Sequence, residues 1–425
     1  MSPSILLVTY QFCPRGGIGT RRWSKFAKYL TRDKGLSVQV LTARYPYQDS
    51  VNWCHDVEDL PGLNIHRISA KYPNYLLRPA RNTVVKVGER VLKRTFYPID
   101  IAQQWGTSMR QHAERLIRKH HIRHLIITGP PFTPLSELEP LKQRFPDLSI
   151  LMDYRDPWIF WVEKQKGANT PLARMVEKRE KQIMAAADRL MFTTPEIRDM
   201  YSQRFPEATA KTRVLPNAFD PDDRPENQPT NPTPRFHFVY AGTLLANRSK
   251  ALGLMIEVIN ELQDPFFTQE MRIDLYGYKY NPPTFSNAAL RKIYDTIVTH
   301  RGAVPPSSLF RKMGEYPFAL LINVPERPGI IPAKTYDYIG LGRNIFLIAP
   351  PGALTHFIQD IGQYTAEISK HSIRETLLRM KADYQEGHTV QISEAIIREN
   401  AYPAATEQLL TYLRETGFVE STIPR

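Results

Sequence analysis

Three glycines near the N-terminus stand where the backbone could approach a ligand closely. Gly16, Gly17 and Gly19 follow a short apolar run and precede Arg21 and Arg22, in the stretch "YQFCPRGGIGTRRW". Glycine adopts a positive φ without steric cost and leaves room for an anion at the backbone amides. The spacing is not the Gly-x-Gly-x-x-Gly pattern of dinucleotide sites. The residues therefore predict a phosphate-approaching loop of another kind.

A second glycine turn, in the other half of the chain, is followed by two cations. The stretch "YAGTLLANRSK" places Gly242 and Thr243 after an apolar run, with Arg248 and Lys250 a few residues further on. Such cations could neutralise a bound phosphate, because charged hydrogen bonds to phosphate are strong. A solvated loop is the alternative interpretation of the same residues.

The stretch "ERPGIIPAKTYDYIGLGR" has the pattern of a helix start that binds an anion. Pro332 suits the first helical position, and Lys334 in the first turn would add a full charge to the free amides there. Asp337, one turn further along, could accept hydrogen bonds from a sugar diol. An ordinary helix with an exposed lysine and aspartate is the alternative. Three residues that precede the helix are also predicted donor contacts: Gly329, Ile330 and Ile331.

Two loops of the first half carry residues predicted to lie on the acceptor side, and Arg21 and Arg22 after the glycine turn are assigned to that side as well. Pro131 lies in "TGPPFTP", and Arg155 and Asp156 lie in "MDYRDPW"; both stretches follow strand-like runs. Ligands of parallel-sheet domains bind at the carboxyl ends of strands. The alternative is that the charge pair only organises its own loop.

Apolar runs that alternate with amphipathic stretches must position these residues. The runs of the first half cover 5–10, 38–41, 63–68, 124–128 and 148–153, and those of the second half are "RFHFVYAG", "MRIDLYGY", "FALLINV" and "NIFLIAP". Such alternation predicts an α/β fold with mostly parallel sheets that are covered on both faces.

The segment "VLPNAFDPDDRPENQPTNPTPR" interrupts this alternation, because it is dense in Pro, Asn and Asp and has no apolar period. It divides the chain into two doubly wound, Rossmann-like domains that we expect to face each other across a cleft. The predicted boundaries are 1–215 for the N-terminal domain, 216–235 for the linker, 236–400 for the C-terminal domain and 401–425 for a helix that crosses back.

The charge of the chain is concentrated in its first half. Residues 1–220 hold 35 Lys and Arg against 21 Asp and Glu, a net +14, whereas the remainder is at −1. A basic half attracts a phosphorylated substrate, an anionic membrane or nucleic acid. Two cysteines, Cys13 and Cys54, give no disulfide framework. With no apolar window of membrane-spanning length, the sequence predicts a cytoplasmic protein.

The ordered motifs resemble a known enzyme family. The series "TYQFCPRGGIGTRRW", "YPIDIAQQW", "TGPPFTP", "DYRDPW", "PNAFD", "YAGTL", "GAVPPSSL" and "PAKTYDYIGLGRNIF" is similar to bacterial glycosyltransferases of family 4, of the surface-glycan type. The resemblance implies the glycosyltransferase-B fold and a retaining, hexosyltransferase-like, metal-independent enzyme without a cofactor. It also implies that the C-terminal domain binds the donor and the N-terminal domain binds the acceptor.

Two positions depart from the pattern of the family. A Glu, seven intervening residues and a second Glu often stand before the donor-binding helix, where this chain has Gly329 and Asp337. Many members also have an Arg directly after the glycine that corresponds to Gly242. In this chain that position is Thr243. The phosphate-binding cations, assigned as catalytic, must then be Arg248, Lys250 or Lys334. The residues assigned to donor binding are Gly16, Gly17, Gly19, Gly242, Thr243, Gly329, Ile330, Ile331 and Asp337.

The predicted reaction moves a sugar from a nucleoside diphosphate sugar to a hydroxyl of an unidentified acceptor, such as a lipid-linked or surface-glycan precursor. A nucleotide-sugar epimerase of the same fold is one alternative, and a non-catalytic protein that binds nucleotide sugars or nucleic acid is another. No nucleic-acid motif occurs, so no nucleic-acid partner is expected.

A basic amphipathic stretch predicts peripheral association with the inner face of an anionic membrane. In "TVVKVGERVLKRTFYP" the apolar Val84, Val87 and Val91 share one helical face, while Lys86 and Arg90 face water. A helix that packs on its own domain is the alternative.

Overall fold

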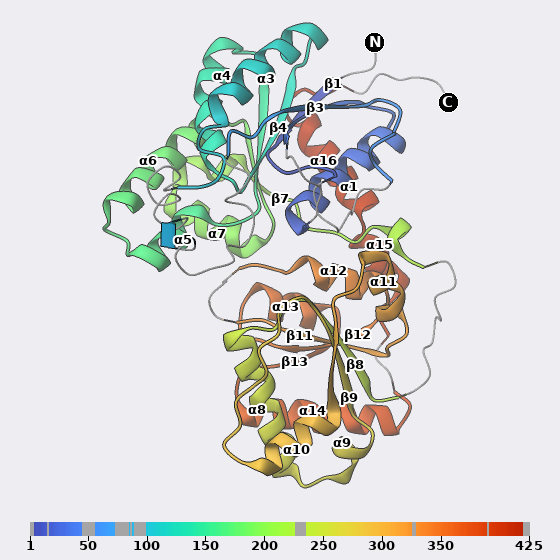
Figure 1. Cartoon of the computed structure of the whole chain (residues 1–425). Helices are drawn as coiled ribbons and strands as arrows, with labels where there is room; N and C mark the ends of the chain where they lie inside the picture. Colours follow the sequence, from blue (N-terminus) through green and yellow to red (C-terminus); the bar gives the residue numbers. More distant parts are fainter. Residues whose placement is uncertain are drawn as a thin grey trace. The chain divides into compact units, whose positions relative to one another are not determined.

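The chain folds into two compact units in a computed structural model (Figure 1). The first unit comprises Met1–Pro216 and Thr406–Arg425, and the second comprises Asn217–Ala405. The residues that the structure describes are 4–14, 17–44, 56–72, 85, 87, 88, 99–225, 235–324, 329–388 and 391–419.

The first unit is built on a parallel sheet of seven strands in the order β3-β2-β1-β4-β5-β6-β7. The strands are β1 (Ser4–Thr9), β2 (Ser37–Arg44), β3 (Leu63–Ser69), β4 (His124–Gly129), β5 (Ser149–Tyr154), β6 (Arg189–Phe192) and β7 (Thr212–Val214). The central strands β4 and β5 are buried along their whole length. Continuous burial explains why these strands read as apolar runs instead of alternating patterns.

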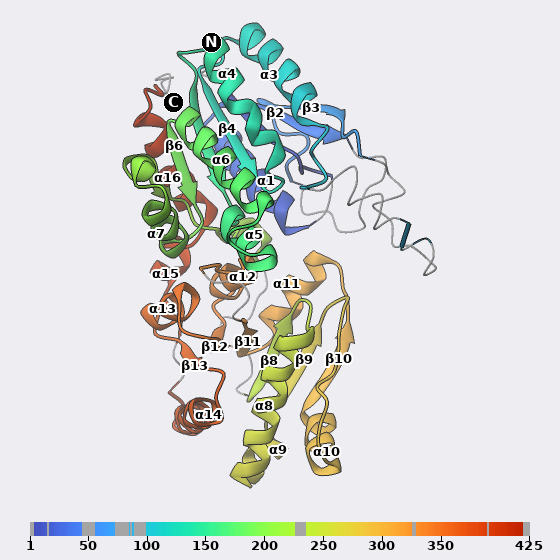
Figure 2. The same cartoon turned by 90° about the vertical axis from the view of Figure 1, so that its left-hand side faces the viewer.

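Helices of the first unit flank this sheet (Figures 1 and 2). They are α1 (Ile18–Arg32), α3 (Gly106–His120), α4 (Leu138–Arg144), α5 (Trp158–Lys166), α6 (Pro171–Ala186) and α7 (Pro195–Arg204), with 3-10 turns at Thr133–Glu137 and Pro206–Lys211. Two of them begin at a threonine cap: Thr170 accepts a hydrogen bond from the Ala173 amide at 3.2 Å, and Thr194 accepts one from Ile197 at 3.2 Å. Each cap satisfies an amide that the helix itself leaves without a partner.

The second unit repeats this plan with six parallel strands in the order β10-β9-β8-β11-β12-β13. The strands are β8 (His237–Ala241), β9 (Arg272–Tyr276), β10 (Val298–Gly302), β11 (Phe318–Ile322), β12 (Asn344–Ile348) and β13 (Tyr364–Ala366). The helices are α8 (Ala246–Leu262), α9 (Pro265–Gln269), α10 (Ala288–Ile297), α11 (Pro306–Gly314), α12 (Ala333–Gly340), α13 (Ala353–Asp360), α14 (Lys370–Gln385) and α15 (Glu394–Glu399). Its core includes the buried rings of Phe236, Phe238 and Phe318.

The end of the chain returns to the first unit through α16 (Tyr402–Arg414). Gln408 and Tyr412 donate hydrogen bonds to the carbonyl of Val214 in β7, at 3.0 and 2.8 Å. Beyond the helix, Glu415 forms ion pairs with Arg189 at 2.9 Å and with Arg213 at 2.8 Å. Residues far apart in the sequence therefore complete one unit.

The predicted fold class of two parallel α/β sheets is confirmed. Four strands were missed by the sequence analysis, namely β6, β7, β10 and β13. Strands β7 and β13 have three residues each, and β10 has a largely exposed pattern. Short or exposed edge strands lack the apolar run on which such a prediction depends. The absence of a disulfide was also wrongly expected: Cys13 is disulfide-bonded, and Cys54 lies outside the described residues.

Candidate functional site

The order of the second sheet defines a point where ligands bind in doubly wound folds. Strands β8 and β11 are neighbours at its centre, and the chain leaves them toward opposite edges. A crevice forms at the carboxyl ends of two such strands. Gly242, with φ +123°, directly follows β8, and α12 follows β11. The glycine turn and the helix predicted from the sequence thus flank the topological switch point of this unit.

Lys334 bridges these two elements. Its Nζ donates a hydrogen bond to the carbonyl of Ala241 at 3.2 Å and lies 4.0 Å from the ring centroid of Tyr240. The Nζ is also 3.8 Å from the position that a Cβ of Gly242 would take. The structure therefore brings two of the predicted donor-site residues together, Lys334 and Gly242.

No carboxylate among the described residues compensates the charge of Lys334. Burial, and secondarily the charge of Arg248, lower the pKa of Lys334 to about 7. A buried ammonium without a counterion is costly, and a bound anion would relieve that cost. The electrostatics of the switch point therefore favour an anionic ligand.

Arg248 lies in the first turn of α8 near the same loop. Its Nη1 is 3.4 Å from the carbonyl of Thr243, which also accepts a hydrogen bond from the Tyr240 hydroxyl at 2.9 Å. The Nε of Arg248 is buried without a hydrogen-bond partner among the described residues. Lys250, by contrast, is exposed on α8. Near this loop, the guanidinium of Arg248 therefore has only some of its hydrogen-bond donors paired, and the ammonium of Lys250 is exposed to solvent.

The start of α12 differs in detail from the prediction. Pro332 is the N-cap, with φ −61°, and the helix begins at Ala333, so the proline lies one position earlier than expected. Gly329 adopts φ +74° and Ile331 is buried, whereas Ile330 is partly exposed. The N-cap side chain makes no hydrogen bond; the Thr335 amide donates to the carbonyl of Pro332 at 2.9 Å, while Ala333 and Lys334 begin the helix, where amides lack an acceptor one turn back.

Asp337 is more deeply placed than the prediction assumed. Its side chain is only 7% exposed, as is expected of a position on the inner face of α12. A contact with a ribose would therefore require the ligand to reach into the crevice beside the helix. The assignment of Asp337 to the donor stays a prediction.

Three residues that contribute to this geometry were not singled out from the sequence. Tyr240 lies beneath Lys334, and the Tyr338 hydroxyl accepts a hydrogen bond from the Ala241 amide at 2.8 Å. Gly277, after β9, lies against the backbone of Gly242. A Cβ at Gly277 would be only 2.2 Å from the Gly242 carbonyl oxygen. Helical spacing could have indicated Tyr338, which lies one turn beyond Lys334. The close approach at Gly277 has no local sequence signal beyond the glycine itself.

In the first unit, Arg155 joins the loops at the carboxyl ends of three strands. It donates to the carbonyl of Gly19 at 2.8 Å, to that of Gly129 at 3.3 Å, and to that of Pro130. A Cβ on Gly19 would lie 2.9 Å from its Nη1. Arg155 therefore organises the turn at the start of α1 together with the loop after β4. Its assignment to the acceptor side stays a prediction.

The two arginines after the glycine turn face the protein interior. Arg22 is 2% exposed and pairs with Asp153 at 2.9 Å, while it also donates to the carbonyls of Leu215 at 2.8 Å and Pro216 at 2.6 Å. Arg21 is 4% exposed. Both guanidiniums are thus directed away from solvent, and Arg22 uses its donors within the first unit.

The other predicted residues of this unit lie at the loop ends. Gly17 is the exposed N-cap of α1 with φ +102°, and Gly16 lies outside the described residues. Pro131 is buried after β4, and Asp156 is partly exposed beside Arg155. Gly17, Gly19, Pro131 and Asp156 therefore surround the same carboxyl edge of the first sheet.

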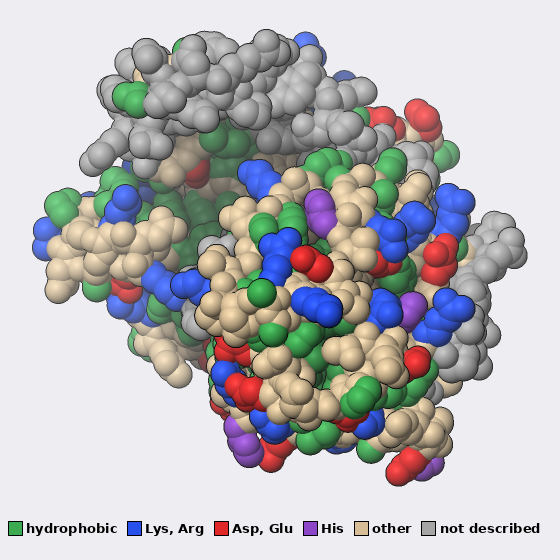
Figure 3. Space-filling view, turned by 60° about the horizontal axis from the view of Figure 1, so that its bottom comes forward, with side chains coloured by type: hydrophobic (Ala, Val, Ile, Leu, Met, Phe, Trp, Pro, Cys, Tyr) green, Lys and Arg blue, Asp and Glu red, His purple; other side chains and the backbone are tan. Residues whose placement is uncertain are grey.

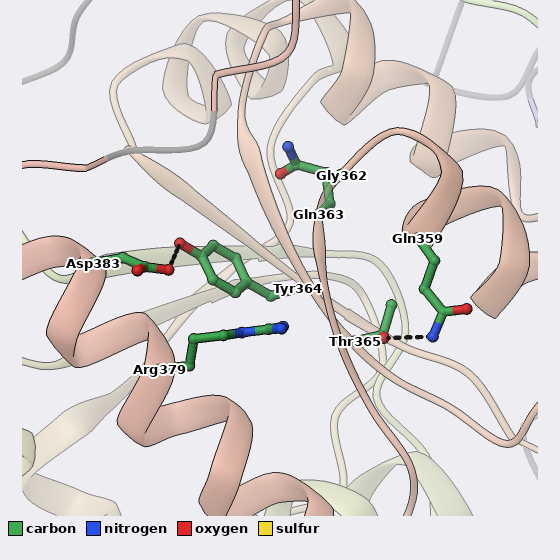
Figure 4. A pocket seen from close by; sticks show the side chains of 7 residues that line it. All are labelled: Gln359, Gly362, Gln363, Tyr364, Thr365, Arg379 and Asp383. Carbon is green, nitrogen blue, oxygen red and sulfur yellow. Dashed lines mark hydrogen bonds between the residues drawn. The ribbon is translucent and has the colours of Figure 1, made fainter.

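A hollow of about 420 Å³ lies elsewhere in the second unit, between β13 and α14 (Figure 4). Its polar groups bond to one another: the Tyr364 hydroxyl donates to Asp383 at 2.7 Å, and Gln359 donates to Thr365 at 3.2 Å. None of the predicted site residues lines it. The hollow is distinct from the switch point.

No family model matches the chain, and no curated protein matches its sequence. It matches solved structures over nearly its full length. Sucrose-phosphate synthase from Thermosynechococcus elongatus matches with a TM-score of 0.65 and 14% identity, covering 97% of this chain and 98% of that one. A glycosyltransferase from Rickettsia africae gives a TM-score of 0.59 and 12% identity, covering 98% of both chains.

A third match carries a bound ligand. The trehalose-6-phosphate structure from E. coli bound with UDP-2-fluoro glucose gives a TM-score of 0.61 and 12% identity, covering 98% of this chain and 100% of that one. At these identities the likeness establishes the fold. The chain has the two-domain, parallel-sheet fold of these enzymes, which is the predicted glycosyltransferase-B fold.

Two further properties of the described residues concern metals and membranes. No group of three or more His, Cys, Asp and Glu side chains is arranged to hold a metal ion there. None of the helices in the described ranges combines the length and the apolar character that crossing a bilayer requires.

Proposed function

We propose that this protein is a metal-independent, retaining glycosyltransferase that takes a nucleoside diphosphate sugar as its donor. The observation that carries the proposal is the partly buried Lys334 beside Gly242 at the switch point of the second sheet, an ammonium with no carboxylate partner among the described residues. A diphosphate is the anion that fits a lysine, an arginine and the free amides of a helix start together. The shared fold of a structure bound with UDP-2-fluoro glucose supports the same ligand class.

In the proposed reaction, the bond between the anomeric carbon and the diphosphate oxygen breaks, a bond to the acceptor oxygen forms, and the proton of the acceptor hydroxyl passes to the departing diphosphate. Negative charge grows on the diphosphate as the first bond breaks. Lys334, Arg248 and the amides at the start of α12 would stabilise that charge, with Lys250 as a further cation at the rim. Preorganised donors of this kind are worth about 3 kcal/mol each when one is removed.

The remaining donor contacts follow from position in the second unit. Gly242 and Thr243 would bring the backbone to the phosphates, and Gly329, Ile330 and Ile331 would line the approach to α12. Asp337 would accept hydrogen bonds from the ribose. Gly16, Gly17 and Gly19 are proposed as amide donors from the first unit.

The acceptor is assigned to the first unit, where Pro131, Arg155 and Asp156 lie at the carboxyl edge of the sheet. For Arg21 and Arg22 an indirect role is more consistent with their burial. A lipid-linked precursor of a surface glycan, used by a family 4 enzyme at the cytoplasmic membrane face, remains the proposed acceptor. The amphipathic stretch behind the membrane proposal falls almost wholly outside the described residues, so flotation with anionic vesicles at low salt must decide it.

Donor screening tests the function most directly. UDP-, GDP-, dTDP- and ADP-sugars are compared by thermal shift, because a ligand at 100 times its Kd stabilises by about 2.7 kcal/mol. The matched donor is then incubated with and without candidate acceptors, and the anomeric configuration of the product is determined by NMR. Release of nucleoside diphosphate only with an acceptor supports a transferase. A new nucleotide sugar formed from the donor alone would indicate an epimerase instead.

A further inference from the structure

Glu180 is an acid in the interior of the first unit. It lies on α6, its exposed fraction is 0%, and its Oε1 accepts a hydrogen bond from the Tyr201 hydroxyl of α7 at 2.7 Å. The Tyr201 hydroxyl in turn accepts a hydrogen bond from the amide of Trp158 in α5 at 2.9 Å. Glu180 therefore connects three helices that follow one another along the chain.

Helix α5 has no cap of its own. Its N-cap is Pro157, which forms no side-chain cap hydrogen bond. The amide of Trp158 donates instead to the Tyr201 hydroxyl at 2.9 Å, and that hydroxyl donates to Glu180. The first amide of α5, which a helix cannot satisfy internally, is thus capped by a side chain of α7 that a carboxyl group of α6 holds in place.

No cation among the described residues forms an ion pair with Glu180. Arg204 of α7, the nearest positive charge, bridges Glu163 at 2.8 Å and Glu177 at 3.0 Å instead. Tyr154 of β5 and Tyr201 are the other titratable groups that face the carboxyl, together with Glu177 on its own helix. The Oε2 of Glu180 and the Tyr154 hydroxyl are buried without hydrogen-bond partners among the described residues.

These surroundings favour the neutral acid. Burial outweighs the hydrogen bonds and raises the pKa of Glu180 from 4.5 to about 8. At pH 7 the carboxyl is therefore mostly protonated.

We propose that Glu180 is a positioning residue that holds Tyr201 as a detached cap for α5 and thereby holds the loop of Arg155 and Asp156. This loop ends at Pro157, directly before the capped amide. Arg155 in turn bonds to the carbonyls of Gly19 and Gly129. Loss of the cap would make the first turn of α5 more mobile. The loops that Arg155 joins would then become more mobile as well. The predicted effect on the acceptor rests on the proposed function, whereas the cap itself does not.

The cap makes the first unit sensitive to pH in a defined direction. Because the folded pKa lies above the unfolded value, the folded state binds the extra proton, so stability falls as pH rises from 4.5 to about 8 and is level above that. If local opening of α5 solvates Glu180, the opening constant rises up to about tenfold per pH unit in that interval. Glu180→Gln keeps the shape and the acceptor oxygen but cannot ionise.

The experiment measures hydrogen exchange at the Trp158 amide, without substrate, between pH 5 and pH 9 and corrected for intrinsic rates. Wild-type protection should fall with pH up to about 8, and Glu180→Gln should remove that fall. Tyr201→Phe should lower the protection of Trp158 roughly fivefold or more, and Glu180→Ala should lower it as well, because the Tyr201 hydroxyl loses its acceptor. Glu177→Gln, on the same helix but facing Arg204, is the matched control and should retain the wild-type pH profile.

Two results would overturn the proposal: a wild-type pH profile in Glu180→Gln, or unchanged protection in both Glu180→Ala and Tyr201→Phe. In the transfer assay, Glu180→Gln should flatten the pH dependence of acceptor KM while leaving donor KM unchanged. The hydrogen-exchange experiment uses no substrate, so it tests the cap even if the protein is not a transferase.

Discussion

At the scale of single residues, the decisive feature is Lys334, which is partly buried and has no carboxylate counterion among the described residues. Its pKa of about 7 means that Lys334 is only half protonated in the empty site at neutral pH. A bound diphosphate favours the protonated form, so binding must take up a proton above pH 7. We expect the Kd for nucleoside diphosphate to rise by up to about tenfold per pH unit above 7. Calorimetry in two buffers of different ionisation enthalpy measures that proton uptake.

Lys334→Arg is the matched variant, because a guanidinium stays charged throughout this range. It should flatten the pH dependence, whereas Lys250→Gln on the exposed part of α8 should retain it. A steep, unchanged pH dependence in Lys334→Arg would show that another group titrates.

Kinetics separate the roles of two residues on α12. Lys334→Ala should lower kcat, since stabilisation that strengthens in the transition state appears there. Asp337→Ala should mainly raise the donor KM, as loss of uniform binding does. The steady-state constants of both variants check the assignment: the reverse pattern would exchange the roles, and unchanged constants would make the helix structural.

At the scale of elements, the glycine turn before α1 combines positive φ with open space. Gly17 has φ +102° with no atom within 4 Å of the point that a Cβ would occupy, and Gly387 has φ +71° with the same free space. Gly17→Val and Gly387→Val should each cost about 1–2 kcal/mol of unfolding free energy for the forced left-handed conformation. Only Gly17→Val should also lose turnover. Denaturant unfolding and the transfer assay measure the two effects, and equal turnover in both variants would make the Gly17 turn merely structural.

The loops after β4 and β5 depend on a buried ion pair beneath them. Asp153 is 0% exposed, binds Arg22, and accepts further hydrogen bonds from Trp23 at 2.6 Å and Thr128 at 2.8 Å. Asp153→Ala should destabilise the first unit by about 3–5 kcal/mol, because it leaves the Arg22 charge buried. Asp199→Ala, which breaks an exposed pair with Arg198, should cost less than about 1 kcal/mol. Denaturant unfolding of the two variants compares them, and equal losses would contradict the structural role of the network.

The sequence predicted the elements whose signals are local and missed those that depend on the tertiary fold. The runs that became β1, β4, β5, β8 and β11 are buried on both faces, so their composition alone revealed them. The start of α12 was placed within one residue. The burial of Arg22 could not be predicted, because its partner Asp153 lies 131 residues away. The same holds for the contact of Gly277 with Gly242, which depends on the pairing of β8 with β9.

At the scale of the whole molecule, the two units share a strand order but differ in surface charge. The net +14 belongs to residues 1–220. The face seen in Figure 3 mixes basic and acidic side chains without a large area of one sign. The second unit carries exposed ion pairs, such as Lys370 with Glu261 at 2.7 Å and Arg374 with Glu261 at 2.9 Å, and residues 221–425 are at −1. The uncompensated Lys334 is therefore a local feature of the switch point and not part of a generally basic surface.

The return of the chain end gives a test of how the molecule divides. Leu409 is 0% exposed in the part of α16 that belongs to the first unit, and Leu377 is 0% exposed in the core of the second unit. Each Leu→Ala change should cost about 2–5 kcal/mol through lost burial and a cavity. If the units unfold separately, Leu409→Ala should increase hydrogen exchange in β6 and β7 and leave β8 to β12 unchanged, while Leu377→Ala should do the opposite. Increased exchange in both units for either variant would mean that they unfold as one cooperative body, in which case the return of α16 couples the units instead of only completing the first.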